Sequence, residues 1–284
     1  MNKIMHVIIL LFLTGCSSLF FYPDRVVYST PSEFGFNYET HKINSKDKTQ
    51  LNAWHIKSNQ KSKGLLILAH GNAQNMTAHF KGWTWLVEAG YELFIFDYRA
   101  YGKSKGEVSI EGSVDDVNAV LDFVEAHVKR DYFLCGQSLG GTLSLAALKE
   151  KSRKRMKALI VDSTFTSFAG IASEKLSYLF LTWPFQWIPY LTLPDEFDAI
   201  DNVREVDKPI LFLHGSLDIT IPANHTWQLF DRSYTPKEFW LVNRAKHIQT
   251  FKHIKVREDF LTFLERVSEG SFYHKSYSRM KIYH

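Results

Sequence analysis

Three residues with the chemistry of nucleophilic catalysis each follow a short apolar run of this sequence. Ser138 lies in Gly-Gln-Ser-Leu-Gly, and small residues two positions before and after a serine fit a tight, strained turn from a strand into a helix. A serine hydroxyl attacks poorly at neutral pH unless a base removes its proton and a third group orients that base. In chain order, Asp218 and then His247 follow Ser138. We therefore expect Ser138 to be a nucleophile, His247 its base and Asp218 the orienting acid.

Other residues are alternatives for two of these roles. The chain has twelve histidines, and His253 is the alternative base, although it falls inside the last predicted helix. Asp162, which ends another apolar run, is the alternative acid. His70 and His214 each begin a His-Gly pair after an apolar run, and we interpret them as structural groups that shape turns.

Acyl transfer by a serine also requires hydrogen-bond donors for the oxygen that becomes negative. The backbone N–H of Leu139 directly follows the nucleophile and is the expected first donor. The second donor is expected from Asn72, in the loop His-Gly-Asn-Ala-Gln-Asn at residues 70–75. Leu139 and Asn72 are therefore the predicted oxyanion hole.

The elements that must position these loops are six short apolar runs with helical stretches between them. Runs that are apolar on both faces are typical of strands buried between two layers of helices, in a mostly parallel, doubly wound α/β sheet. The carboxyl ends of such strands share one edge, so the loops that carry the three residues should meet there. The predicted strands cover residues 64–70, 91–98, 132–136, 157–163, 209–215 and 237–242.

Flanking patterns complete the predicted domain. Residues 34–58 alternate polar and apolar around a charged turn, which predicts an antiparallel hairpin. Ser113 with Asp116 resembles a capping box and predicts a helix start there. The α/β domain is predicted over residues 34–267, followed by a basic peripheral tail at 268–284.

An aromatic insertion interrupts the alternation of strands and helices at about residues 165–200. It holds nine aromatic residues and three prolines, too long for an ordinary loop and too rich in proline for one straight helix, which predicts a short cap over the site. Its aromatic side chains either line an apolar acyl pocket or bury the cap against the core. The candidate pocket residues are Phe165, Phe168, Trp183 and Trp187.

The amino terminus resembles a bacterial lipoprotein signal. An apolar stretch at residues 4–13 is too short to span a bilayer comfortably, and Leu-Thr-Gly-Cys at 13–16 is similar to a lipobox. This resemblance implies a signal peptide at 1–15, lipidation of Cys16, an anchor or linker at 16–33 and a location in the bacterial envelope. Ser17 favours the outer membrane, facing the periplasm. An ordinary cleaved signal and a short uncleaved anchor are the alternatives.

Composition excludes several other function classes. A formal net charge of +4 is too small to predict a nucleic-acid partner. No paired His or Cys spacing of the zinc type occurs, so we expect no metal and no cofactor. Gly-Lys-Ser at 102–104 imitates the end of a phosphate-binding loop, but Asp97 stands where that motif needs a glycine. Cys135 is interpreted as a buried apolar residue.

Taken in order, the motifs resemble serine α/β-hydrolases with an HGNxxN loop, a group that includes small-cap esterases and depalmitoylase-like proteins. The departures are Ala100, where glycine is common, and the lack of a glycine before His247. The resemblance implies hydrolysis of an ester or thioester with a small-molecule or lipid-like acyl group through an acyl-enzyme. A peptidase or amidase on the same triad and a non-catalytic envelope lipoprotein are the alternatives. The matching segments are HGNAQN, FDYRAYGKSKGE, GQSLGG, VDSTFTS, LPDEFDAIDNV and KPILFLHGSLDITIP.

Overall fold

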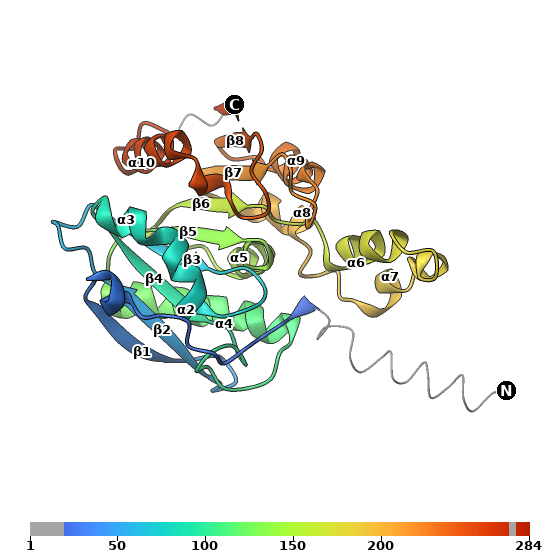
Figure 1. The fold of residues 1–284 in the computed structure, drawn as a ribbon, viewed down its shortest axis with the longest axis horizontal. Coiled ribbons are helices and arrows are strands. Elements are labelled where there is room, and N and C mark those ends of the chain that lie inside the picture. The colour runs from blue at the N-terminus through green and yellow to red at the C-terminus, as the bar shows by residue number, and fades with distance from the viewer. Residues whose placement is uncertain (1–19, 273–276) are drawn as a thin grey trace.

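One sheet forms the centre of the protein. The computed structural model describes residues 20–272 and 277–284, and within them nine strands lie in the order β1-β2-β4-β3-β5-β6-β7-β8-β9 (Figure 1). The predicted hairpin, β1 and β2, is antiparallel to its neighbours, and all other neighbouring strands are parallel. The strands are β1 (Tyr38–Asn44), β2 (Gln50–Ile56), β3 (Gly64–Ala69), β4 (Tyr91–Asp97), β5 (Tyr132–Gln137), β6 (Met156–Asp162), β7 (Ile210–Gly215), β8 (Lys237–Val242) and β9 (Ser278–Tyr283).

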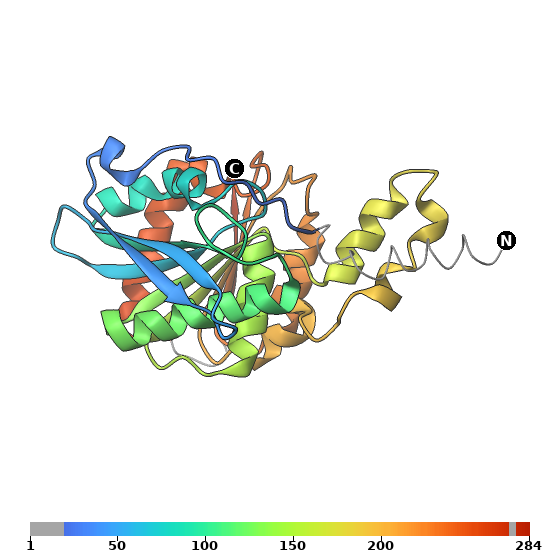
Figure 2. The same ribbon diagram turned by 90° about the horizontal axis from the view of Figure 1, so that it is seen from below.

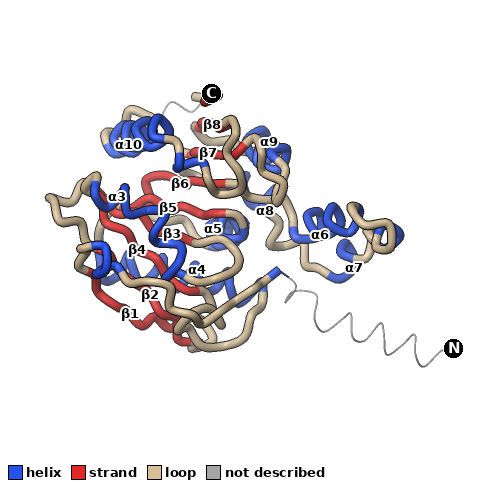
Figure 3. Tube along the Cα trace, in the orientation of Figure 1, coloured by secondary structure: helices blue, strands red, loops and turns tan. Residues whose placement is uncertain are grey.

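Helices cover both faces of this sheet, as the apolar runs predict (Figures 1 and 3). Along β3, Leu65 and Ile67 pack against the core under α4 and α5, while Leu66 and Leu68 pack against the core under α3 and α10. This alternation produces two apolar layers around one sheet. The helices are α2 (Met76–His79), α3 (Thr84–Glu88), α4 (Ile110–Phe123), α5 (Leu139–Glu150), α6 (Phe168–Ser177), α7 (Pro189–Thr192), α8 (Ala199–Asn202), α9 (Ala223–Arg232) and α10 (Ile254–Ser268).

Helix α4 begins earlier than the capping-box pattern predicts. Its cap is Ser109, whose hydroxyl accepts a hydrogen bond from the Gly112 N–H at 3.1 Å. Ser113 is buried inside the helix, and the Asp116 carboxylate instead accepts hydrogen bonds from the Arg99 guanidinium. The prediction of a helix start at Ser113 is therefore wrong, because Asp116 serves a buried ion pair rather than a cap.

The carboxyl-terminal segment is part of the sheet and not a peripheral tail. Residues 278–283 form β9, which pairs in parallel with β8 along its whole length. The predicted domain end at residue 267 is thus wrong. Strand β9 lies at the edge of the sheet, and most of its side chains face solvent. Its sequence therefore lacks the apolar run that predicts the inner strands.

The amino-terminal part of the described chain lies along the body rather than hanging free as a linker. The Phe21 side chain is buried, Pro23 forms a parallel bridge with Gln74, and the Asn75 amide donates to the Val26 carbonyl at 2.7 Å. The predicted signal peptide and Cys16 lie outside the described residues. In residues 20–272 and 277–284, no helix has both the length and the apolar character needed to cross a membrane.

A small cap projects from the body between β6 and β7. Helices α6 and α7 stand away from the sheet in both views (Figures 1 and 2). The cap is joined to the body by α8 on one side, and on the other by residues 163–167, the last of which, Ser167, caps α6 by accepting from the Gly170 N–H at 2.9 Å.

Candidate active site

Ser138 occupies a strained turn between β5 and α5. Its backbone has φ 54° and ψ −118°, a conformation that residues with a side chain adopt rarely and that is over-represented at active sites. The Ser138 N–H donates to the Asp162 carbonyl at 2.8 Å, which fixes the turn against the end of β6. A Cβ atom at Gly140 would lie 2.1 Å from the Ala69 carbonyl oxygen. Glycine is therefore required for α5 to start so close to the end of β3.

Ser138, His247 and Asp218 are joined in series. Nε2 of His247 lies 3.0 Å from Oγ of Ser138, and Nδ1 of the same ring lies 2.7 Å from Oδ2 of Asp218. These residues come from the loops after β5, β8 and β7, three strands whose carboxyl ends share one edge. The Ser138 and Asp218 side chains are largely buried, and the His247 side chain is 21% exposed. The imidazole is thus open to solvent on one side, while the Asp218 carboxylate is shielded.

The Asp218 carboxylate is held in its charged form. Burial by itself would raise its pKa, but hydrogen bonds from His214 and His247 and the backbone N–H of Ile221 outweigh burial, so the pKa of Asp218 lies below its ordinary value. The second carboxylate oxygen, Oδ1, accepts from the N–H groups of Thr220 and Ile221, both at 2.9 Å. These bonds fix the orientation of the oxygen that faces His247.

The alternative acid and base lie elsewhere. The Asp162 carboxylate accepts from Nε2 of Gln137 at 2.9 Å and from the Ser163 hydroxyl at 3.1 Å, and burial raises its pKa. His253 is the residue that precedes α10 rather than one inside the helix, so its predicted placement is wrong by one residue. Asp218 and His247 therefore lie in series with the serine. Asp162 instead forms its side-chain hydrogen bonds with Gln137 and Ser163.

One of the two His-Gly pairs, His214 with Gly215, supports the residues of the triad. His214 is fully buried, and its ring bonds to the Thr226 hydroxyl at 2.7 Å and lies 3.3 Å from Oδ2 of Asp218. A Cβ atom at Gly215 would lie 2.4 Å from the Ala245 carbonyl oxygen, so this glycine lets the loop that carries His247 pass directly over the end of β7. The Leu217 N–H donates to the same carbonyl at 2.9 Å, which ties the acid loop to the histidine loop.

The loop predicted to complete an oxyanion hole lies beside the serine. A Cβ atom at Gly71 would be 3.6 Å from Cβ of Ser138. Asn72 follows, and its Oδ1 accepts from the Tyr101 hydroxyl at 2.7 Å and from the Tyr22 N–H at 2.9 Å. Leu139 is the first residue of α5, and N–H groups at the start of a helix have no partner within the helix. The two predicted donors thus lie on a loop beside Ser138 and at the start of the helix that follows it.

Comparison with known proteins identifies the family. The Hydrolase_4 family profile, described as serine aminopeptidase, S33, matches residues 60–200. The uncharacterised protein YfhR of Escherichia coli is 34% identical over 262 residues, which cover 87% of this chain and 86% of YfhR. The chain belongs to the Hydrolase_4 family of the α/β-hydrolase superfamily. Membership in this family supports a hydrolase activity.

More distant similarities extend beyond bacteria. The α/β-hydrolase domain-containing protein WAV2 of Arabidopsis thaliana is 29% identical over 215 residues, 72% of this chain and 69% of that protein. Among solved structures, the esterase Pf2001 of Pyrococcus furiosus superposes with a TM-score of 0.69 at 20% identity, over 88% of this chain and 98% of that one. The predicted α/β-hydrolase fold is thereby confirmed.

Two tyrosines of this Hydrolase_4 protein, Tyr98 and Tyr101, hold the Asn72 loop in place. Neither was predicted from the sequence to belong to the site. The Tyr98 hydroxyl donates to the His70 carbonyl at 2.9 Å, and the Tyr101 hydroxyl donates to Asn72. Both rings are buried, and an aromatic residue type by itself predicts such a core position rather than a role in the site. The available signal was their place in the FDYRAYG segment, at the carboxyl end of a predicted strand, where a buried hydroxyl needs a partner.

The four aromatic residues predicted to line one acyl pocket do not lie together. Phe165 and Phe168 are buried in the core, with ring centroids 5.2 Å apart, and form the base of the cap. Trp183 and Trp187 are more than half exposed on the projecting part. The prediction of one pocket from these residues is wrong, because the cap extends away from the body instead of folding over Ser138.

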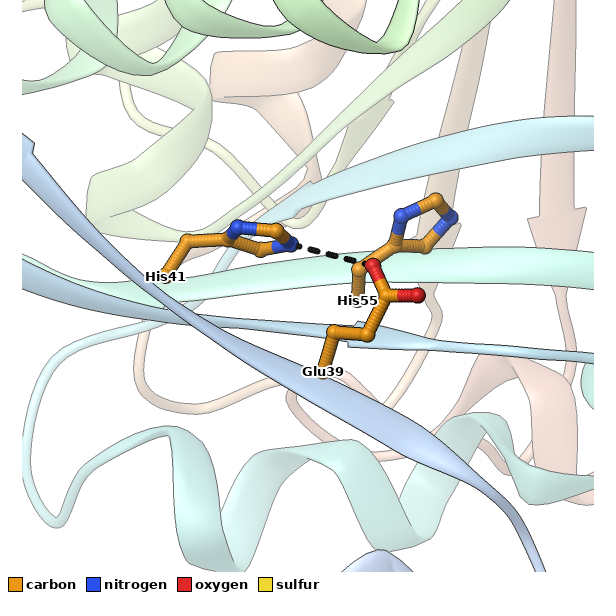
Figure 4. A group of neighbouring side chains, drawn as sticks. All are labelled: Glu39, His41 and His55. Atoms are coloured by element: carbon orange, nitrogen blue, oxygen red, sulfur yellow. Dashed lines mark ion pairs between the residues drawn. The ribbon is translucent and has the colours of Figure 1, made fainter.

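A group of possible metal ligands lies on the first two strands, apart from the serine. Ligand atoms of Glu39, His41 and His55 are all within 4.8 Å of one another (Figure 4). The Lys57 ammonium, however, lies 2.9 Å from Nδ1 of His55 and 3.6 Å from Glu39, and the other His55 nitrogen bonds to Glu92 at 2.6 Å. The Lys57 ammonium thus contacts two of the three possible ligands, His55 and Glu39, and His55 is also paired with Glu92, so we assign no metal to this group.

Proposed function

We propose that this protein is a serine hydrolase that cleaves ester or thioester bonds through a triad of Ser138, His247 and Asp218. The observation that carries the proposal is the pair of contacts made by one imidazole, 3.0 Å to the serine oxygen and 2.7 Å to the carboxylate. This is the arrangement in which a base can accept the serine proton while a carboxylate stabilises the imidazolium that forms.

In the proposed reaction, Nε2 of His247 takes the proton of the Ser138 hydroxyl as Oγ attacks the acyl carbonyl carbon. The carbonyl oxygen becomes negative and accepts hydrogen bonds from the backbone N–H groups of Asn72 and Leu139. Collapse of the tetrahedral intermediate breaks the bond to the leaving group, which receives the proton from His247. Water, deprotonated by the same imidazole, then releases the acid and regenerates the serine.

Amide cleavage is the second candidate reaction. The family profile carries the description serine aminopeptidase, and the same triad can expel an amine that His247 protonates. The two reactions differ in the leaving group rather than in the catalytic residues. A panel that pairs p-nitrophenyl acyl esters with amino-acid p-nitroanilides distinguishes them, since faster release from the anilides would reject an esterase.

A fluorophosphonate probe tests the triad itself, because such probes react rapidly only with an activated serine. We expect the wild type to be labelled and Ser138→Ala to be unlabelled, with turnover lower by about four orders of magnitude. Ser144→Ala is the matched control: Ser144 lies in α5, the helix that follows Ser138, and it is buried and without a hydrogen-bond partner in the described structure. Labelling or turnover of Ser138→Ala near that of wild type would reject Ser138 as the nucleophile, and a wild type with neither labelling nor turnover would favour a non-catalytic lipoprotein.

We also propose that the protein is anchored in the bacterial envelope by a lipid on Cys16, facing the periplasm from the outer membrane. The support is the apolar stretch and the lipobox-like Leu-Thr-Gly-Cys before Ser17. Metabolic labelling with an alkyne fatty acid should mark the wild type and leave Cys16→Ser unmarked. Equal labelling of both, or labelling of neither, would reject lipidation at this residue.

A further inference from the structure

The projecting end of the cap exposes an unusual amount of apolar surface. Phe180 is 93% exposed and Leu181 is 84% exposed. A large exposed apolar patch on a folded domain marks a surface that binds a membrane or another protein. We call residues 178–191 the cap tip; its large exposed side chains are Tyr178, Leu179, Phe180, Leu181, Trp183, Phe185, Trp187, Tyr190 and Leu191.

The composition of the cap tip indicates what covers it. No charged residue occurs between residues 176 and 194, while tryptophan and tyrosine recur. These two side chains concentrate at the boundary between lipid and water, because each ring is apolar at one end and polar at the other. The absence of charge favours entry into a bilayer, where each charged side chain would be costly.

The shape of the cap tip favours a fluid partner over a rigid one. It stands away from the body in both views, and exposed apolar residues occur both before η5 (Trp183–Phe185) and on α7 (Figures 1 and 2). A projection that is apolar on several sides cannot be covered by one flat surface of a second copy. Lipid chains can surround it.

The amino-terminal segment leaves the described structure at the base of the same cap. The Phe20 ring packs edge-to-face on Phe168, the first residue of α6, with centroids 5.2 Å apart. Cys16, the proposed site of lipidation, lies four residues earlier, and four extended residues reach about 14 Å. A membrane that holds a lipid on Cys16 would therefore lie close to the base of the cap.

Exposed apolar side chains also lie at the edge of the site, on a loop that contacts the cap. The Lys175 ammonium, on α6, donates to the Ile219 carbonyl at 3.4 Å. Ile219 and Leu217 are exposed, and they flank Asp218 on either side in the sequence. A surface in contact with the cap tip would thus extend towards the rim beside the triad.

We propose that the cap tip inserts into the interfacial layer of a lipid bilayer and holds the active site at the membrane surface. Acyl chains leaving the bilayer would then approach Ser138 along the apolar rim. The insertion is independent of catalysis, and only the statement about acyl substrates rests on the proposed function.

Quenching of tryptophan fluorescence by brominated lipid tests the insertion in the full chain. Vesicles of phosphatidylethanolamine and phosphatidylglycerol, with bromine on the acyl chains, quench only tryptophans that enter the bilayer. The first nineteen residues contain no tryptophan, so a separate anchor does not contribute to the signal. Trp54, Trp83 and Trp240 are buried in the core, and Trp85 on α3 and Trp227 on α9 are partly exposed on the body. Trp183 and Trp187 are the tryptophans of the cap tip and the expected source of quenching.

We expect wild type to be quenched and the double variant Trp183→Phe/Trp187→Phe to lose most of that quenching. Trp227→Phe is the matched control, since Trp227 is partly exposed on α9, and it should keep the wild-type quenching. Ser138→Ala should also keep it, which separates a failure of insertion from a failure of the triad.

Three results would overturn the proposal. The first is that the wild type is not quenched, and the second is that quenching survives in the double variant. The third is that light scattering shows the wild type to be a dimer without lipid, and that Phe180→Ser/Leu181→Ser converts this dimer to a monomer. The last result would assign the cap tip to a second copy of the chain.

Discussion

The Tyr101 hydroxyl donates a hydrogen bond of 2.7 Å to Oδ1 of Asn72, across 29 residues of chain. The same oxygen accepts from the Tyr22 N–H, so the loop after β3, the loop after β4 and the amino-terminal segment meet at one atom. Burial raises the pKa of Tyr101, which keeps the hydroxyl protonated and able to donate. The position of Asn72 beside the serine depends on this contact.

Tyr101→Phe should lower kcat without unfolding the protein. Phenylalanine keeps the buried ring but removes one of the hydrogen bonds that hold Asn72, and a less firmly held donor weakens the stabilisation of the oxyanion. Since removing a donor outright costs about 10²- to 10³-fold, we expect a loss of about tenfold in kcat with KM little changed. The measurement is steady-state ester hydrolysis, with the exposed Tyr234→Phe as control. A change confined to KM would contradict the positioning role.

Asp218→Asn should disable the triad, while Asp162→Asn should not. The amide of the first variant cannot stabilise an imidazolium, so kcat should fall by about four orders of magnitude. Asp162 is buried nearby but bonds to Gln137 and Ser163, and an asparagine there retains one acceptor oxygen. Fluorophosphonate labelling rates of the two variants provide the comparison. Equal losses in both would show that the acid is not assigned correctly.

Ala100→Gly should stabilise the fold. Ala100 has φ 68°, in the left-handed region that costs a residue with a side chain about 1 kcal/mol, and glycine avoids that cost at some expense in chain entropy. The net gain should be about 0.5 kcal/mol in the free energy of unfolding, measured in urea. Ala119→Gly, inside α4, is the opposite control and should lose about 1 kcal/mol. A destabilised Ala100→Gly would show that no strain is relieved.

Asp198 should make stability depend on pH at the base of the cap. Burial raises its pKa from 3.8 to about 6, so between these values the folded protein holds a proton that the unfolded chain has released. The free energy of unfolding therefore falls as the pH rises from about 4 to about 6, and stays lower above that.

Asp198→Asn removes this titration. It keeps an oxygen that can accept from the Phe168 N–H, whose nitrogen lies 3.2 Å from Oδ1 of Asp198 in the wild type. We expect the variant to match wild type near pH 4 and to be more stable at pH 8 by about 1 kcal/mol, allowing for solvent screening. Thermal unfolding across this pH range is the measurement, with the exposed Asp231→Asn as control. Parallel curves for wild type and variant would show that Asp198 does not titrate abnormally.

The inner sheet and the loops of the site were predictable from sequence because each leaves a local signature. The apolar runs that became β3 to β8 are buried on both faces, and Ser138, Asp218 and His247 each follow the end of such a run. Chain order and the shared edge of parallel strands were then enough to place the three residues together.

Features that depend on distant contacts were not predictable in the same way. The start of α4 was misplaced because Asp116 pairs with Arg99, which precedes the helix and gives no sign in the local pattern. The pocket prediction failed because aromatic content does not say whether a ring faces the core, as Phe168 does, or the solvent, as Trp183 does. Asn72 and its partners Tyr22 and Tyr101 come from three segments, and no spacing rule links them.

Strand β9 has a practical consequence for handling this protein. It covers one edge of β8, whose Trp240 is fully buried and whose neighbour Asn243 donates from its N–H to the Tyr283 carbonyl at 2.8 Å. Deleting the codons for residues 278–283 would uncover a row of unpaired peptide groups on β8 that other chains can join. Truncated preparations should precipitate on concentration, and purification handles are better attached elsewhere.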